Sequence, residues 1–241
     1  YAFQDIAKRG SSGFVAEIGS DVTSIGTYAF TGCGYQCTGD INITFKCVLN
    51  SINTYAFNQV GYGCNGNIYI YIPCNCQSIG NYAFSEVGRT AKKNLDIMFN
   101  GRANSIGAYC FQYAGYSMTN SLTIMFPNAS LNTIGTKAFY QTGYSCSGNV
   151  DMLFNCSNLN IASNAFLEAA QSSRREVSIT FNGGVVSNIG SSAFQNVGRY
   201  GSGFLTFIAN CESAIIGSSA FSNAARDNYG VNLTFIGTIY K

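Results

Sequence analysis

The feature that most constrains this chain is a phrase that returns every 27 or 28 residues. It reads SIGTYAF at residues 24–30, SINTYAF at 51–57 and SIGNYAF at 78–84. Successive phenylalanines of the phrase are separated by 27, 27, 27, 27, 28, 27, 28 and 27 residues. Self-similarity at a fixed period is typical of repeat architectures. The phenylalanines of this first ladder are Phe3, Phe30, Phe57, Phe84, Phe111, Phe139, Phe166, Phe194 and Phe221.

Short alternating segments lie between the phrases. Examples are INITF at residues 41–45, IYIYI at 68–72 and LDIMF at 95–99. Period-two alternation of apolar β-branched and aromatic residues predicts a strand with one buried face. Their ends define a second apolar ladder, expected inside: Ile18, Phe45, Ile72, Phe99, Phe126, Phe154, Phe181, Phe207 and Phe235.

One coil of about 27 residues cannot bury its own apolar edge, but a stack of such coils can. We therefore predict a single solenoid over residues 1–241 with about nine coils. Each coil is expected to contain one short parallel strand. The phrase itself has apolar residues at helix-like spacing followed by glycine, which predicts a short helical or 3₁₀ turn.

The wording of the repeat resembles a known family. The segment VTSIGTYAF at residues 22–30, followed by Cys33, is similar to the BspA-like leucine-rich repeat, and the likeness recurs at every repeat. The resemblance implies a leucine-rich-repeat-like solenoid. It also implies a role as a surface adhesin or recognition module.

Composition argues against several function classes. Only 10% of the residues are charged and the net charge is +2, which does not favour a nucleic-acid partner. No apolar run is long enough to predict membrane insertion. Histidine is absent and the acidic residues are scattered, so we expect no enzyme, no cofactor and no metal site.

Ten cysteines favour an oxidising, extracellular compartment. Three coils carry a cysteine both 7 and 17 residues after the phrase phenylalanine, which predicts disulfides within coils: Cys37–Cys47, Cys64–Cys74 and Cys146–Cys156. A rival scheme pairs neighbouring coils, Cys37–Cys64 and Cys47–Cys74. The isolated pair Cys146 and Cys156 argues against that rival. Cys33 and Cys110 are expected to be buried thiols, and the spacing of Cys47, Cys64, Cys74 and Cys76 matches no zinc pattern.

Strand alternation also identifies outward residues. Tyr69, Tyr71, Met98, Met125 and Leu153 should form a contiguous exposed stripe, which usually marks a contact surface. A covering loop or coil is the alternative. Four sequons make Asn42, Asn128, Asn155 and Asn232 glycosylation candidates. Tyr35, Tyr62, Tyr116 and Tyr144 share one repeat position, where a stacking ladder is favoured over a carbohydrate-binding row.

Neither end of the sequence carries a polar capping coil, so the solenoid is expected to be uncapped. Our first hypothesis is an extracellular structural protein that stacks head to tail with copies of itself into a surface filament. The joint would involve Tyr1, Phe3, Phe14, Ile18, Phe235 and Ile239. The second hypothesis is a cell-surface adhesin that recognises a protein or carbohydrate ligand through the stripe.

Overall fold

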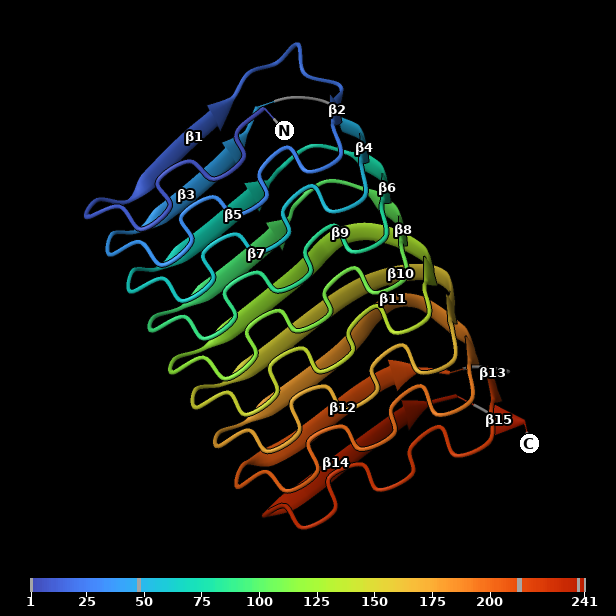
Figure 1. Cartoon of the computed structure of the whole chain (residues 1–241). Coiled ribbons are helices and arrows are strands. Elements are labelled where there is room, and N and C mark those ends of the chain that lie inside the picture. Colours follow the sequence, from blue (N-terminus) through green and yellow to red (C-terminus); the bar gives the residue numbers. More distant parts are fainter. Residues whose placement is uncertain (1, 47–48, 212–213, 238, 241) are drawn as a thin grey trace.

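The computed structural model describes residues 2–46, 49–211, 214–237 and 239–240. The chain winds into a parallel β-solenoid, as the repeat predicts (Figure 1). Nine strands follow one another along its main sheet in the order β1-β3-β5-β7-β9-β10-β11-β12-β14. They are separated by eight full turns of the chain, close to the nine coils expected.

The strands fall into two rows, which merge into long strands in the middle of the molecule. The bounds are β1 Phe14–Ile18, β2 Ser24–Ile25, β3 Ile41–Phe45, β4 Leu49–Ile52, β5 Ile68–Ile72, β6 Cys76–Ile79, β7 Leu95–Phe99, β8 Ala103–Ile106, β9 Leu122–Ile134, β10 Val150–Ile161, β11 Val177–Ile189, β12 Phe204–Asn210, β13 Ala214–Ile216, β14 Gly230–Ile236 and β15 Ile239–Tyr240.

Strand register follows the repeat. Ile41 pairs with Ile68, Ile68 with Leu95, and Leu95 with Leu122, so equivalent residues of successive coils lie side by side. Along β3, β5 and β7 the side chains alternate between buried and half-buried. This alternation confirms the predicted inward and outward faces of the sheet.

The expectation of one strand per coil was incomplete, because β2, β4, β6 and β8 form a second strand that ends at the isoleucine of the phrase. In β4, Leu49 and Ile52 are buried while Asn50 between them is exposed. The isoleucine of the phrase is therefore a strand residue that points into the core. Its side chain is buried at Ile25, Ile52, Ile79, Ile106, Ile134, Ile161 and Ile189.

The predicted helical or 3₁₀ turn was wrong: among the described residues, the end of the phrase and the segment after it form a ribbon of successive β-turns. The N–H of Tyr62 bonds to Gln59 O and that of Cys64 to Gly61 O, at 3.2 and 3.0 Å. The third residue of each turn, Gly61 or Gly63, has φ near +60°. Positive φ at this position defines a type II turn. A helix cannot contain such residues at every second position.

The ribbon is stable because its remaining N–H groups bond to neighbouring coils. Gln59 N donates to Ser85 O of the next coil at 2.9 Å, and Gly61 N donates to Cys33 O of the previous coil at the same distance. Alternate amides thus bond within the coil and between coils. The backbone N–H groups of the ribbon therefore find carbonyl partners, as those of a central strand in a sheet do.

Phenylalanine fills the interior. Rings of the first ladder stack in nearly parallel, offset planes with centroids 4.6–5.1 Å apart from Phe3 to Phe221. Rings of the second ladder meet them edge to face, as Phe99 does with Phe84 at 5.6 Å. Both arrangements suit the charge distribution of the aromatic ring.

One member of the second ladder was misassigned. Phe207 pairs with Ile179, and Ala209 takes the place opposite Phe181. Phe207 remains buried and its ring lies 5.8 Å from that of Phe181. An aromatic ring thus still fills this part of the core, although it lies two residues earlier in the strand. A shift of two residues keeps the same face of the strand inward.

Candidate contact surfaces

The predicted stripe on the outer sheet face is brought together by register. Tyr71 pairs with Met98, Met98 with Met125, and Met125 with Leu153. These four side chains form one row across β5, β7, β9 and β10, each half-buried. We call this row, together with Tyr69, the sheet-face stripe.

Tyr69 and Tyr71 make the aromatic end of the stripe. Their rings lie 6.0 Å apart at an interplanar angle of 15°. Asn100 Nδ2 donates a hydrogen bond to Tyr71 Oη at 3.2 Å. Burial, followed by the neighbouring Tyr71 and Asp96, raises the pKa of Tyr69. The two rings are therefore held in place on the surface before any partner arrives.

Beyond Leu153 the row becomes polar and then apolar again. Thr180 follows Leu153, and the register of β12 places Ile208 next to Thr180. The repeat spacing alone predicts Thr206 in this row and Phe204 in the neighbouring one. The shift at β12 instead sets Thr206 opposite Ser178 and leaves Phe204 exposed at the start of the strand.

The tyrosine row on the turn ribbon is a stacking ladder, as favoured. Tyr35 stacks on Tyr62 and Tyr116 on Tyr144, each pair with centroids 5.0 Å apart. Because each ring face lies against its neighbour, these faces are not available to stack on a sugar. The geometry therefore does not support the carbohydrate alternative at this row.

Arg89 fills the gap in that ladder. Its guanidinium carbon lies 5.8 Å from the ring centroid of Tyr62 and 5.0 Å from that of Tyr116. Its Nη1 also lies 3.3 Å from Glu86 Oε2. The planar cation replaces one ring of the stack, which accounts for arginine at a tyrosine position.

A second tyrosine ladder was missed by the sequence analysis. Tyr28, Tyr55, Tyr82 and Tyr109 stack at 4.9–5.1 Å, two residues before the phrase phenylalanine. The repeated letters TYAF, TYAF, NYAF and AYCF carried this signal. All four residues have positive φ, which turns their side chains away from the interior where the phenylalanines lie.

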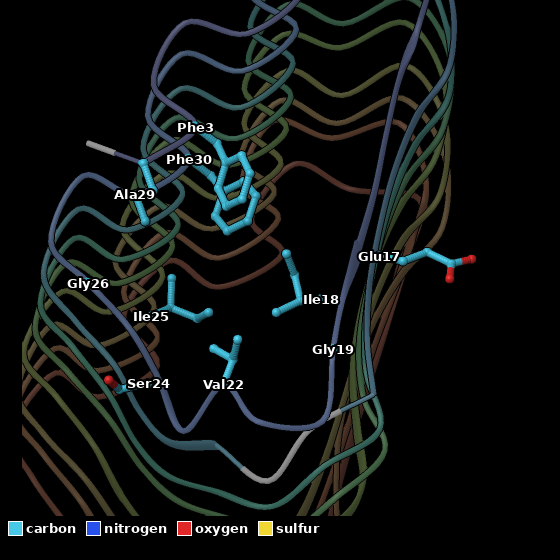
Figure 2. Close-up of a pocket in the computed structure, with 11 residues that line it drawn as sticks. Phe3, Glu17, Ile18, Gly19, Val22, Ser24, Ile25, Gly26, Ala29 and Phe30 are labelled. Carbon is cyan, nitrogen blue, oxygen red and sulfur yellow. The ribbon is translucent and has the colours of Figure 1, made fainter.

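The N-terminal end of the solenoid opens into an apolar cavity of about 390 Å³. Figure 2 shows Ile18, Val22 and Ile25 pointing into it beneath the stacked rings of Phe3 and Phe30, with Glu17 turned away. Phe3 and Ile18, two of the predicted joint residues, thus line one space. Phe14 is half-buried in the strand that leads to it.

The opposite end also presents core positions. Val231 and Leu233 pair with the buried Leu205 and Phe207, yet they are 48% and 39% exposed. Phe235 contacts Phe207 and Phe221 at 5.5 and 5.4 Å. Tyr1 lies outside the described residues, and the side chain of Ile239 is not described either. The structure therefore describes the side chains of four of the six predicted joint residues.

The two within-coil cysteine pairs that lie in the described part of the chain are not brought together. Cys146 Sγ lies 3.1 Å from Asn120 O, before β10, whereas Cys156 Sγ lies within that strand near Asn182 O at 3.4 Å. The six extended residue steps from Val150 to Cys156 span about 20 Å. Both cysteines are free. Cys64 and Cys74 likewise lie before and after β5, and Cys47 of the remaining pair lies outside the described residues.

The structure instead brings together one pair of the rival scheme. Cys37 Sγ lies 3.1 Å from Cys64 Sγ across two neighbouring coils. Cys33 and Cys110 are buried as expected, and Cys33 Sγ contacts Phe3 O at 2.6 Å. In the described part of the chain, no three potential metal ligands gather in one place.

The glycosylation candidates differ in accessibility. Asn128 and Asn232 are exposed, whereas Asn42 and Asn155 are half-buried. Asn155 Nδ2 donates to Pro127 O at 2.7 Å, and Asn128 Nδ2 donates to Asn100 Oδ1 at the same distance. Asn232 Oδ1 accepts a hydrogen bond from Thr234 Oγ1 of its own sequon at 2.8 Å, and both residues lie on the strand β14. Asn232 thus combines an exposed side chain with a hydrogen bond that uses its oxygen, whereas Asn128 and Asn155 both donate from Nδ2.

The BspA type leucine-rich repeat region matches residues 14–143 and 62–228, with six copies. The chain belongs to this family. Neither the curated proteins nor the solved structures contain a match to this BspA-type chain. Among its described residues there is no helix long and apolar enough to cross a membrane.

Proposed function

We propose that this BspA-type chain is a non-enzymatic protein of the cell surface that binds a protein partner through the sheet-face stripe. The observation that supports it is the row Tyr71, Met98, Met125 and Leu153, four apolar side chains held in register on an open sheet face. All of them lie in central coils with described neighbours on both sides. The proposal is therefore independent of how the ends are covered.

The chemistry of the stripe favours a protein over a sugar. Methionine side chains are flexible and polarisable, and they suit apolar surfaces that adapt to a partner. Tyrosine is enriched where interfaces carry most of their binding energy. Within the row, Tyr71 supplies the one hydroxyl, and Asn100 already donates to it. The hydrogen-bonding side chains of Asp96, Thr123 and Asp151 lie on the neighbouring outward row and not in this one.

The test measures binding of labelled full chain to cultured epithelial cells, with and without prior trypsin treatment of the cells. We expect saturable binding that trypsin abolishes and that Met98→Lys with Met125→Lys lowers at least tenfold. Thr180→Lys, on the same row beyond the stripe, is the matched control and should bind as wild type. Equal binding by the stripe variant and the wild type would refute the proposal.

End-to-end stacking is the second candidate, and a different observation favours it. The apolar cavity beside Phe3 and Ile18 faces one end, while the exposed Val231 and Leu233 face the other. The outer strands β1 and β14 each have one partner in the main sheet. A second copy could extend both the sheet and the ring ladder, giving an open fibre.

Sedimentation velocity over a hundredfold concentration range tests this candidate. Stacking predicts species that grow with concentration, and Leu233→Asp should return them to monomers. Asp is chosen because a buried, unpaired charge is strongly unfavourable at an apolar joint. The exposed Ile215→Asp, on the second strand row, serves as the control. A monodisperse wild-type monomer throughout would exclude the filament.

A further inference from the structure

We propose that Cys37 and Cys64 are oxidised to a disulfide that links two neighbouring coils of the solenoid. Their sulfur atoms lie 3.1 Å apart, closer than the van der Waals contact of two sulfurs. Both side chains are fully buried. Closing the bond requires the sulfurs to approach by about a further 1 Å, to the S–S length of about 2.05 Å.

The backbone around the pair suits this bond. Each cysteine is the last residue of an equivalent turn, with Cys37 N bonded to Gly34 O and Cys64 N to Gly61 O. Equivalent residues of stacked parallel coils lie about 4.8 Å apart, inside the range of about 4.4–6.8 Å that disulfides span between Cα atoms. Both thiols also lie 3.3 Å from Gly39 O, so they are turned toward the same point.

Cys37 and Cys64 are neighbouring cysteines at one repeat position, seven residues after the phrase phenylalanine. The equivalent positions hold Ala91, Met118, Cys146 and Ser173 in later coils. Cys146 therefore has methionine and serine as row neighbours and no thiol with which to pair. A metal is not favoured at Cys37 and Cys64, because no third ligand joins them among the described residues.

The bond forms by exchange with oxidised glutathione. The thiolate of one cysteine attacks a glutathione sulfur and releases one glutathione; the second cysteine then attacks the mixed disulfide and releases another. Two thiols are oxidised, one glutathione disulfide is reduced, and both protons end on glutathione. Burial, followed by contact with Cys64, raises the pKa of Cys37 to about 12. Thiolate is therefore scarce in the folded chain, which places the exchange during assembly of the coils.

A disulfide between two coils would affect how the solenoid unfolds. In a solenoid each coil is held only by its neighbours, so separation can start at any one interface. A covalent link between the coils of Phe30 and Phe57 removes one interface from that set. It does so close to the cavity beside Phe3, where the core is open.

The experiment folds the full chain in a buffer of reduced and oxidised glutathione and blocks free thiols with N-ethylmaleimide. Non-reducing digestion and mass spectrometry should recover the Cys37 peptide linked to the Cys64 peptide. Recovery of both as alkylated thiols, or of Cys37 linked to Cys47, would overturn the proposal.

Thermal unfolding gives an independent readout. Reduction should lower the melting temperature of the wild type by about 5–10 °C. Cys64→Ala should lose this dependence on reductant, and alanine is compatible with the row because Ala91 occupies the same position. Cys146→Ala is the matched control and should retain the dependence. Full retention in Cys64→Ala would contradict the link.

Discussion

Gly61 lies directly against the side chain of Ile68, where the turn ribbon crosses the start of β5. A Cβ added to Gly61 would lie 2.4 Å from Ile68 Cδ1, and the residue has a φ of +62°. Gly34 meets Ile41 in the same way, at 2.3 Å. The glycine of the repeat thus lets the ribbon pack closely on the first strand residue of its own coil.

Gly61→Ala should lower the free energy of unfolding by about 2–4 kcal/mol. About 1 kcal/mol of this is backbone strain at positive φ, and the remainder comes from displacing Ile68. Chemical denaturation measures the change. Gly63→Ala is the control, because its φ of +64° is similar but the nearest atom is the flexible Gln36 Cγ at 3.2 Å. Equal losses in the two variants would show that close packing contributes nothing.

Phe111→Ala should be among the most destabilising substitutions. Its ring is fully buried between those of Phe84 and Phe139, at 5.1 and 4.9 Å. Removing a buried phenylalanine costs about 3–5 kcal/mol through lost burial and the cavity left behind. Urea denaturation checks this value. Phe204→Ala, at a residue 44% exposed, should change stability by less than about 1 kcal/mol.

Arg89→Tyr should be tolerated or stabilising, whereas Arg89→Ala should cost about 1–2 kcal/mol. A tyrosine would continue the stack of Tyr62 and Tyr116 and remove the buried Arg89 Nε, which has no hydrogen-bond partner in the described structure. Alanine would leave a gap in the ladder. Thermal denaturation compares the two, with Arg226→Ala as an exposed control. A tyrosine variant less stable than the alanine variant would contradict the stacking argument.

Asp151→Asn should stabilise the protein at neutral pH. Burial, followed by the neighbouring Glu176, raises the pKa of Asp151 above its ordinary value of 3.8. The folded state therefore favours the protonated acid. Protonation of Asp151 contributes fully to stability below pH 3.8, and this contribution is lost as the pH rises through the folded pKa. Asparagine carries no charge, so its advantage should appear above that range and vanish below it.

Denaturation at pH 3 and pH 7 measures the difference. Glu176→Gln removes the second cause and should reproduce a smaller part of the gain at pH 7. A variant Asp151→Asn that is less stable than the wild type at pH 7 would show that the carboxylate is favourably bound.

The glycosylation candidates give a further prediction. On expression in a secretory host, Asn232 should carry a glycan more fully than Asn155, whose Nδ2 already donates to Pro127 O at 2.7 Å. Glycopeptide mass spectrometry measures the occupancy of each site. Asn232→Gln should remove the glycan with no loss of stability. Higher occupancy at Asn155 than at Asn232 would contradict the argument from contacts.

The sequence by itself determined which residues are equivalent, and through them which residues are neighbours along the solenoid axis. The 27-residue period predicted the stacked phenylalanines, the inward and outward strand faces, and the row from Tyr71 to Leu153. These predictions succeed because parallel coils place equivalent residues about 4.8 Å apart whatever the shape of the coil. Where the spacing changed, at Phe207, the sequence alone could not choose between two registers that bury the same face.

Only the tertiary structure decided what happens within a coil. Whether Cys146 could meet Cys156, ten residues later, depended on the path of the chain, and most of the stretch between them is the extended strand β10. The phrase has helix-like spacing, yet its alternate amides bond to other coils, as Gln59 N does to Ser85 O. Hydrogen bonds to neighbours hold residues such as Tyr55 and Gln59 at positive φ, which no local preference predicts. The repeat period determines which residues contact one another along the solenoid axis. The path of the backbone within a coil depends on hydrogen bonds that exist only once the coils are stacked.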